Sequence, residues 1–371
     1  MTSQTADVIV IGGGLHGCSA ALHLANQGLQ VVVIEKDRVG RHASGVNAGG
    51  VRRLGRDFNE VPIAEASNGL WRRISDLVDD DCGFEESGQI QVAETAEEWA
   101  AQDERVRALR ARGFSHEQML DQSELLARMP AVSAHCIGGV AVDGDGFADP
   151  YRTVLAFARK AGAKGVRILQ GTSVQAIYRN GDTWRVQTSG ADLEAPFLVN
   201  CAGAWGHNIA AMLGDTVPLV ADAPMLMVTA RVDPFLTPVV GAYGRNLSFK
   251  QFANGSVLIG GGFRGTADPD RNLARVDVRG LAASARTAAA IFPLIRGAPI
   301  VRSWAGIEGF TPDGIPVIGP SAMANAFHAF GFCGHGFQLG PIVGGIIADL
   351  VTTGQSTLPI DAFRIDRFAN R

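Results

Sequence analysis

The chain begins with blocks of apolar residues separated by glycines. A run from Asp7 to Ile11, apolar after its first residue, leads into glycines at 12 to 14 and then into an Ala/Leu-rich stretch that ends at Gly28. A second apolar run, Val31 to Ile34, ends in Glu35. The apolar runs predict strands, the glycines a tight turn, and the Ala/Leu stretch a helix. Together they predict a β-α-β unit of about thirty residues, the size of a mononucleotide-binding half-fold.

Two later segments repeat the pattern of a strand followed by glycines. Phe197 to Val199 leads into the run Asn200 to Trp205, and Ala326 to Ala329 leads into a glycine-rich turn that ends at Gly336. We infer a Rossmann-like dinucleotide-binding lobe that is assembled from discontinuous segments. Its predicted ranges are 1–80, 140–215 and 300–371.

The material between these segments has a different pattern. Four short segments predict β-ribbons: Gln89 to Ala93, Thr183 to Thr188, Leu247 to Phe252 and Ser256 to Gly260. Ala253-Asn254-Gly255 predicts a hairpin turn between the last two. The ribbons predict a mainly antiparallel second lobe, residues 81–139 and 216–299, for substrate. Helical patterns at Ile63 to Val78, Glu97 to Arg112, Pro150 to Ala161 and Val278 to Phe292 would connect and cover the sheets. The predicted class is α/β with α+β.

Composition agrees with a two-lobed globular protein. The 371 residues exceed one typical hydrophobic core, and 46% are hydrophobic against 19% charged. The formal net charge of −4 leaves no excess of Lys or Arg to neutralise phosphates along a polynucleotide. Nucleic acid is therefore not an expected partner.

Cysteine usage and the chain start bear on the compartment. The five cysteines are widely spaced, with no C-x-x-C pair, so neither a disulfide framework nor a zinc site is expected. No cleavable signal can be drawn before Val8, and the apolar stretch Pro341 to Val351 is too short to span a bilayer. We expect a cytoplasmic protein that reaches a membrane only through a partner.

The glycines at the first turn carry a dinucleotide fingerprint. In Gly12-x-Gly14-x-x-Gly17 the first glycine permits the tight turn, the second lets the backbone approach a pyrophosphate, and the third lets helix and strand pack closely. Glu35 follows eighteen residues after Gly17, where an acidic residue would hold a ribose diol. A motif placed between a strand and a helix, with this acidic residue, predicts dinucleotide binding.

The C-terminal third of the sequence indicates that the dinucleotide is FAD and not NAD. The runs Trp304 to Gly319 and Gly331 to Phe337 resemble the FAD-dependent superfamily of glycine oxidase, D-amino acid oxidase and sarcosine oxidase. With the first fingerprint and Asn200 to Trp205, the resemblance covers residues 7 to about 350. It implies a flavin extended between two lobes, with its ADP end on the Gly12 loop and its ring near a helix that begins around Gly336. A helix N-terminus there would favour the negative charge of a reduced flavin.

The resemblance also implies the residues that hold FAD. The expected set combines the two glycine-rich turns, the loop after the second strand and the turn after Asn200: Gly12, Gly14, Gly17, Glu35, Lys36, His42, Ser44, Asn47, Ala48, Gly49, Val174, Ala202, Gly203, Trp205, Gly306, Gly331, Gly334, Gly336, Phe337 and Gln338.

The segment Arg41 to Arg53 has few bulky apolar residues and predicts a loop. In the superfamily this loop passes close to the flavin, and an arginine at its end binds substrate carboxylate, a role that matches Arg52 or Arg53. Some relatives attach FAD covalently through a histidine in a similar His-Ala-x-Gly setting, which matches His42. A non-covalent flavin with a hydrogen-bonded His42 is the commoner arrangement, and both stay open.

Departures from the family pattern narrow the substrate. Glu308 stands where glycine oxidases have an arginine, and Gln338 stands where monomeric sarcosine oxidases have a lysine. Neither supplies positive charge, although Glu308 would suit a cationic amine or guanidinium and Gln338 can donate a hydrogen bond. Carboxylate binding then falls to Arg52, Arg302 or a residue not identified.

Three further residues are candidates on the expected substrate side. His335 lies in the second glycine-rich turn and would either act on substrate or order the turn beside the flavin. Tyr243 and Phe249 lie on the expected substrate sheet and would either line a pocket or pack in the core. The predicted catalytic set is Arg52, Glu308, His335, Gln338 and Tyr243.

The expected activity is FAD-dependent oxidation of the C–N bond of a small amino acid, imino acid or N-substituted amino acid, by hydride transfer to flavin and hydrolysis of the imine. The resemblance is nearest to catalytic β-type subunits of opine, D-hydroxyproline or glycine (hydrogen cyanide synthase) dehydrogenases. It implies partner subunits for electron transfer, with a second flavin, FMN, at an interface as one arrangement. A flavin monooxygenase, an NAD-dependent dehydrogenase, a non-catalytic electron-relay subunit and a flavoprotein that modifies nucleic acid are the alternatives.

Overall fold

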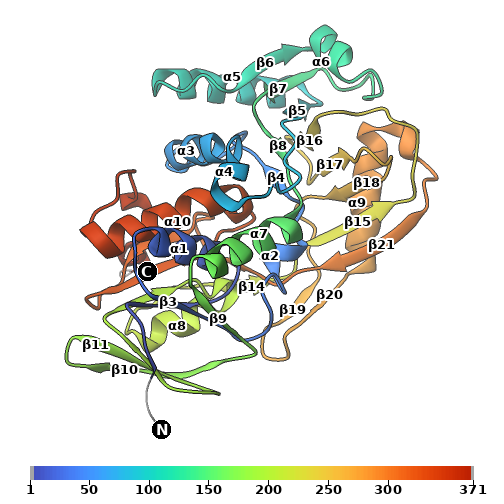
Figure 1. Cartoon of the computed structure of the whole chain (residues 1–371). Helices are drawn as coiled ribbons and strands as arrows, with labels where there is room; N and C mark the ends of the chain where they lie inside the picture. Colours follow the sequence, from blue (N-terminus) through green and yellow to red (C-terminus); the bar gives the residue numbers. More distant parts are fainter. Residues whose placement is uncertain (1–3, 369–371) are drawn as a thin grey trace.

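The strand β2, Val8–Ile11, is the centre of a six-stranded sheet. In the computed structural model, which describes residues 4–368, this sheet has the order β23-β24-β13-β2-β3-β9 (Figure 1). The other five strands are β3 Val31–Glu35, β9 Arg167–Gln170, β13 Phe197–Asn200, β23 Val317–Pro320 and β24 Ala326–Phe330. All neighbours pair in parallel except β23 with β24. The predicted Rossmann-like lobe, built from discontinuous segments, is confirmed.

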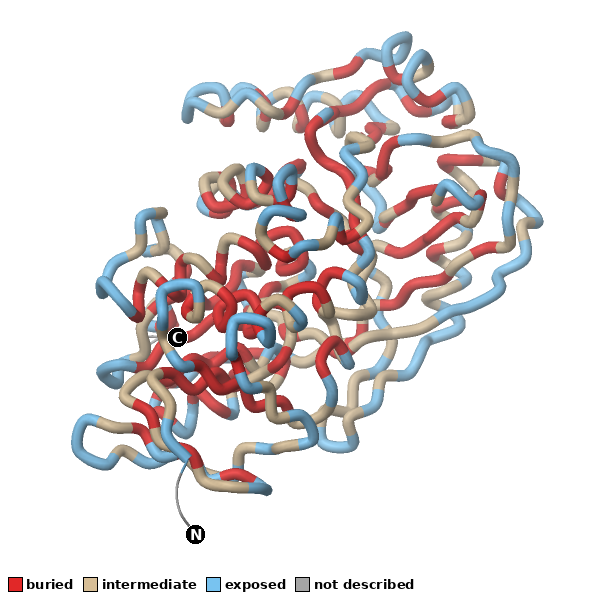
Figure 2. Tube along the Cα trace, in the orientation of Figure 1, coloured by how far each residue is buried: buried red, intermediate tan, exposed pale blue. Residues whose placement is uncertain are grey.

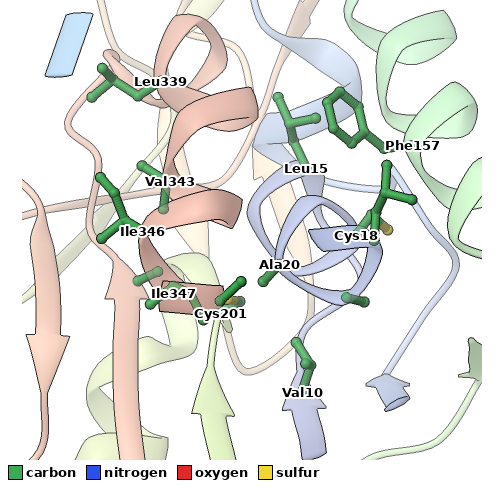
Figure 3. Packing of buried hydrophobic residues seen from close by; sticks show 14 of the residues in the cluster. Val10, Leu15, Cys18, Ala20, Phe157, Cys201, Leu339, Val343, Ile346 and Ile347 are labelled. Atoms are coloured by element: carbon green, nitrogen blue, oxygen red, sulfur yellow. The ribbon is translucent and has the colours of Figure 1, made fainter. Parts of the chain in front are cut away.

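Alternate residues of β2 enter two different cores because side chains of a strand point to opposite faces. Val8 and Val10 pack with the helices α1, Leu15–Asn26, and α10, Gly336–Thr353, as Figure 3 shows for Val10, Leu15 and Val343. Ile9 and Ile11 pack on the other face against a four-stranded sheet, in the order β1-β12-β11-β10. Both faces are covered, which explains why β2 is apolar throughout.

The second lobe is built on an eight-stranded sheet, in the order β21-β15-β18-β17-β16-β5-β7-β6. Its pairs are antiparallel except β16 with β5. The helix α9, Val278–Ile291, covers it, and Phe249 and Phe292 stack with ring centroids 4.7 Å apart in its core. The strands are β5 Gln89–Ala93, β6 Gln118–Asp121, β7 Gly138–Val142, β15 Met225–Thr229, β16 Val239–Ala242, β17 Ser248–Gln251, β18 Val257–Gly260 and β21 Ile300–Ala305.

The remaining elements are shorter or peripheral. The helices are α2 Ala43–Val46, α3 Val61–Trp71, α4 Ile74–Val78, α5 Ala96–Ala111, α6 Gln122–Arg128, α7 Pro150–Ala163 and α8 Gly206–Met212. The strands are β1 Gln4–Thr5, β4 Gly50–Val51, β8 Gly146–Phe147, β10 Val174–Asn180, β11 Thr183–Thr188, β12 Leu193–Ala195, β14 Val220–Asp222, β19 Thr266–Asp268, β20 Leu273–Arg275 and β22 Glu308–Phe310. Figure 2 shows the buried segments concentrated in the sheets and the helices next to them.

Several predicted elements differ from the structure. The helix predicted at Ile63 to Val78 is broken into α3 and α4 by Arg72 and Arg73. The ribbon Thr183 to Thr188 forms β11, which packs on the six-stranded sheet because Trp184 and Val186 belong to the core that contains Ile9. This agrees with the predicted range 140–215 and not with the assignment of the ribbon to the second lobe. The strand β21 lies inside the predicted range 300–371 but pairs with β15 in the eight-stranded sheet. Since β21 belongs to the sheet of the second lobe, the boundary between the two lobes falls after Ala305.

The helix α10 is the one described helix that is long and apolar enough to cross a membrane. Of its 18-residue window, 72% is buried inside the protein. Gly340 and Gly344 let it pack closely on α1, since a Cβ at either would lie within 2.5 Å of Leu15 or Ser19. Its apolar residues are therefore accounted for by the core.

Candidate functional site

A cavity of about 790 Å³ is lined by residues of both lobes. The carboxyl ends of β2, β3 and β13 open into it through Gly12, Glu35 and Ala202. The strands β5 and β17 contribute Gln91 and Ser248 from the other sheet. In open parallel sheets, ligands bind at this edge.

The first glycine turn forms one end of the cavity. Gly12 has a φ of +107°, and a Cβ there would lie 2.4 Å from the carbonyl oxygen of Cys201. A Cβ on Gly17 would lie 1.8 Å from the carbonyl oxygen of Gly12. Only glycine allows this approach, which brings the N-terminus of α1 to the cavity wall, where its partial positive charge favours phosphate.

Glu35, the last residue of β3, lies in the wall beside this turn. Its two carboxylate oxygens accept hydrogen bonds from the backbone N–H of Gly13, at 2.7 Å, and of Asp37, at 2.8 Å. Burial raises its pKa, and the two backbone donors oppose that shift. The carboxylate is fixed where a ribose diol would meet it.

A cluster of Lys36, Asp37, His42, Trp205 and Asn272 lies next to Glu35. The Asp37 carboxylate accepts from Lys36 Nζ at 2.7 Å and lies 3.0 Å from His42 Nε2. Lys36 Nζ also lies 3.9 Å from the centre of the Trp205 ring. Asn272, between β19 and β20, donates to Asp37 and accepts from Lys36, so the second lobe ties down this corner.

The segment predicted as a loop after Arg41 contains the short helix α2 and the strand β4. Ser44 Oγ accepts from the N–H of Leu15 at 2.9 Å, which joins α2 to the start of α1. From the second lobe, Lys250 Nζ donates to the carbonyl oxygen of Ala48 at 2.7 Å, and Trp304 Nε1 donates to that of Val46 at 2.8 Å. The backbone along the cavity is therefore held from both lobes.

The structure distinguishes between the two candidate arginines. Arg52 lines the cavity, and its Nη1 donates to the carbonyl oxygen of Leu54 at 2.6 Å. Arg53 points away from the cavity and pairs with Asp145 at 3.0 Å and Glu65 at 2.9 Å. Between residues 4 and 368 no carboxylate lies within 4.0 Å of the Arg52 guanidinium. Arg302, the other candidate, is exposed on β21 and lies outside the cavity wall.

His335 directly precedes α10 and lies in the wall. Its Nδ1 is 2.8 Å from Oε2 of Glu60, a fully buried carboxylate at the start of α3. Arg56 Nη2 donates to the carbonyl oxygen of His335 at 3.1 Å. Burial and the charge of Arg56 lower the pKa of His335 to about 4.

Glu308 lies in the wall on β22, and its Oε1 accepts from the N–H of Gly334 at 2.7 Å. Burial raises its pKa. Arg264 also lines the cavity, where it pairs with Asp222 at 2.7 Å and covers the ring of Phe310 at 4.0 Å. This end of the cavity therefore carries both a carboxylate and a guanidinium.

Seventeen residues of the expected FAD set lie in this one wall: Gly12, Gly14, Glu35, Lys36, His42, Ser44, Asn47, Ala48, Val174, Ala202, Gly203, Trp205, Gly306, Gly331, Gly334, Gly336 and Phe337. Gly17 and Gly49 are not among the residues that line the cavity. Gly17 acts on the turn through its close contact with Gly12.

Two expected catalytic residues lie elsewhere. Gln338 is fully buried between α10 and α3, where its amide bonds to Arg56 and to the carbonyl oxygen of Ala64. Its side chain faces α3, where Arg56 and the carbonyl oxygen of Ala64 supply its hydrogen-bond partners. Tyr243 is 45% exposed and lies outside the wall, and Phe249 is a core residue.

The sequence reasoning did not identify Arg56, Glu60, Arg264 and Asn272. Arg56 and Glu60 lie four residues apart just before α3, and the Arg-x-x-x-Glu spacing was the available signal. Arg264 and Asn272 reach the site from connecting segments distant in sequence, so no local pattern points to them.

A Rossmann-type sheet, a glycine turn at the start of a helix and a cavity shared with an antiparallel lobe define a two-lobed dinucleotide-binding protein. Residues 7–350 match the family model described as FAD dependent oxidoreductase. The chain belongs to this family of FAD-dependent oxidoreductases, which confirms the resemblance seen in the sequence.

The similar proteins agree in fold and in kind of enzyme. The chain is 27% identical to the sarcosine oxidase subunit beta of Rhizobium meliloti (strain 1021), over 98% of this chain and 88% of that protein. It is 28% identical to the glycine oxidase of Geobacillus kaustophilus (strain HTA426), over 97% of each. The crystal structure of L-proline dehydrogenase from P. horikoshii matches with a TM-score of 0.91, at 26% identity over 99% of both chains.

The residues present fit FAD. Gly12 and Gly17 allow the tight turn that brings the N-terminus of α1 to the cavity wall, and the Glu35 carboxylate is held at the wall beside it. His16, in the same turn, lies in the wall with its ring stacked on Phe332, and its buried Nε2 has no hydrogen-bond partner among the described residues. The wall continues from this turn to the start of α10, as an extended dinucleotide requires.

Proposed function

We propose that the protein oxidises the C–N bond of a small amino acid, imino acid or N-substituted amino acid, giving an imine that water hydrolyses. Sarcosine, glycine and L-proline, in the names of the three similar proteins, all belong to this class. The observation that carries the proposal is Arg52. A guanidinium in the cavity wall, with no carboxylate within 4.0 Å in the described chain, suits the carboxylate of such a substrate.

The chain's own residues would bind FAD, orient the substrate and exclude water from the site. The Gly12 turn, Glu35 and Lys36 would hold the ADP part of FAD, and the backbone around Gly334 and Gly336 would lie against its ring. When bound, FAD accepts a hydride from the carbon that bears the nitrogen. Arg52 would fix the substrate carboxylate, so that binding energy is used for orientation. Apolar wall residues such as Met225, Val239 and Leu247 would exclude water.

The test is anaerobic bleaching of the flavin absorbance by sarcosine, glycine, D- and L-proline, the hydroxyprolines, octopine and nopaline. We expect at least one to bleach it rapidly. Arg52→Gln should raise the half-saturating substrate concentration about 10-fold to 150-fold, since a charged hydrogen-bonded pair contributes about 1.5 to 3 kcal/mol, while FAD stays bound. Arg107→Gln, an exposed arginine outside the cavity, is the control and should behave as wild type. A spectrum that stays oxidised with every compound contradicts the proposal and favours an electron-relay role.

We propose that FAD is held without a covalent bond. In support, His42 Nε2 lies 3.0 Å from Asp37 and the ring packs at 4.7 Å from Trp205, so the imidazole already has partners. Acid precipitation should release all flavin into the supernatant. Flavin fluorescence that stays on the denatured wild-type chain and is lost in His42→Ala would establish the covalent link instead.

We propose a partner subunit with an acidic surface. The segment 264–302 holds seven arginines, all exposed, against three aspartates. It includes β21, an edge strand on which Ile300 and Val301 are 45% and 64% exposed. Exposed apolar residues among arginines are typical of interfaces. Native mass spectrometry should show a second subunit whose binding is lost when Arg275 and Arg302 are changed to Glu. A monomer with fast oxygen-dependent turnover contradicts the proposal.

Two further proposals depend on that partner. A second flavin, FMN, would lie at the shared interface and would appear as a second flavin species in the native complex. The protein would be cytoplasmic and would reach a membrane only through the partner. Fractionation of cells with and without the partner gene would test the location.

A further inference from the structure

Glu60 and His335 form a buried pair at the cavity wall. His335 Nδ1 lies 2.8 Å from Glu60 Oε2, and the Glu60 side chain has no exposure to solvent. The His335 side chain is 20% exposed, and the residue lines the cavity. Within residues 4–368 its Nε2 has no hydrogen-bond partner. One ring nitrogen therefore faces a buried carboxylate, and the other is left for a ligand.

The charges around the pair fix which nitrogen carries the proton. Burial raises the pKa of Glu60, but the hydrogen bond from His335 and the charge of Arg56, whose Nη1 is 3.8 Å away, outweigh it and leave the pKa below its usual range. An ionised carboxylate only accepts hydrogen bonds, so Nδ1 must be the donor. Burial and Arg56 keep the ring neutral, with a pKa of about 4. A neutral ring protonated on Nδ1 has a lone pair on Nε2.

The groups that face His335 disfavour a cation next to it. Arg52 and Arg56 lie on the segment before α3, and the positive end of α10 begins at the next residue. Glu60 is already paired with His335, and Glu308 bonds to the N–H of Gly334 on the other side of the turn. A substrate amine next to Nε2 would meet an acceptor in surroundings that favour its neutral form. The neutral amine is the form that has the nitrogen lone pair needed to release a hydride from its carbon.

On the basis of the proposed function, we propose that Glu60 holds His335 as the Nδ1–H tautomer and that its Nε2 accepts a hydrogen bond from the N–H of the neutral substrate amine. His335 is then the residue that recognises the amine, and Glu60 is a positioning residue that acts through it. Arg52 recognises the carboxylate from a separate element. Together the two would select a compound that carries both groups.

The tautomer is tested first, on the wild-type holoenzyme. With ¹⁵N-labelled histidine and a His335→Asn spectrum for assignment, NMR at neutral pH should show Nδ1 protonated and Nε2 unprotonated. A proton on Nε2 would overturn the proposal whatever the enzyme does with amines.

The ligand test uses two probes of the same shape. Pyrrole-2-carboxylate carries an N–H where 2-furoate carries an oxygen, and neither has a saturated C–N bond to oxidise. Titrations followed by the flavin visible spectrum give both Kd values without turnover. We expect the pyrrole to bind wild type about tenfold more tightly, as one hydrogen bond allows.

Two variants make the result specific to Nε2. In His335→Asn the amide nitrogen lies near the place of Nδ1 and can still donate to Glu60, but no acceptor reaches the cavity, so the tenfold preference should fall to about one. In His335→Gln the amide oxygen lies near the place of Nε2 and should restore most of the preference. An unchanged preference in His335→Asn would overturn the proposal. If neither probe perturbs the wild-type flavin, the proposed function fails, and the NMR measurement still decides the tautomer.

Discussion

The close approach of Gly17 to Gly12 gives a sharp prediction for FAD binding. In Gly17→Ala the new Cβ would lie 1.8 Å from the carbonyl oxygen of Gly12. Ordinary van der Waals contact begins at about 3.4 Å, so α1 and the turn would have to separate by more than 1 Å. Overpacking of this kind costs about 1 to 3 kcal/mol. Because the displaced turn is the one that would approach the pyrophosphate, we expect the cost to appear in FAD binding, as a Kd raised about 5-fold to 150-fold.

The assay is titration of the apoprotein with FAD, followed by quenching of flavin fluorescence, with circular dichroism to confirm the fold. Gly69→Ala is the matched control, because Gly69 is also inside a helix, α3, and a Cβ there meets nothing within 4 Å. It should bind FAD as wild type and be more stable by about 0.5 to 1 kcal/mol. Wild-type affinity in Gly17→Ala would refute the argument that close packing at this turn positions the cofactor.

Three further predictions concern stability and the corner beside Glu35. Asp145→Ala should lower the free energy of unfolding, measured with urea, by about 1 to 3 kcal/mol for each buried donor left without its acceptor, because Asp145 accepts from the N–H groups of Arg53 and Leu54 and from Arg53 Nε, while Glu65 still pairs with the guanidinium. Burial lowers the pKa of Lys250 to about 7, so between pH 7 and the pKa of this lysine in the unfolded chain, the unfolded chain binds more protons than the folded chain. The free energy of unfolding of wild type relative to that of Lys250→Met should therefore rise from pH 7 to pH 10. A difference that does not change with pH would refute this prediction. Asn272→Ala removes both contacts to Lys36 and Asp37 and should speed FAD release severalfold in a stopped-flow displacement experiment, while leaving thermal unfolding within a few degrees of wild type.

Within the loop along the cavity, the side chains of adjacent residues point in different directions. Arg52 and Arg53 are neighbours of the same type, yet only Arg52 lines the cavity, and Arg53 is bound by Asp145 from a distant turn. His335 and Gln338 differ in the same way at the start of α10. A local pattern identifies such a segment, but the direction of each side chain depends on the elements that pack around it.

The sequence by itself determined the strands and turns that depend only on residues close together in the chain. The apolar run of β2, the glycine turn and Glu35 at the end of β3 follow from backbone sterics and side-chain period, so they could be predicted without the structure. The hairpin turn before Ser256 follows for the same reason, with Gly255 at a φ of +88°. The tertiary structure decided which distant groups meet: Glu60 with His335, and Asn272 with Lys36 and Asp37. These contacts depend on the packing of whole helices and sheets, and no short-range rule of sequence determines that packing.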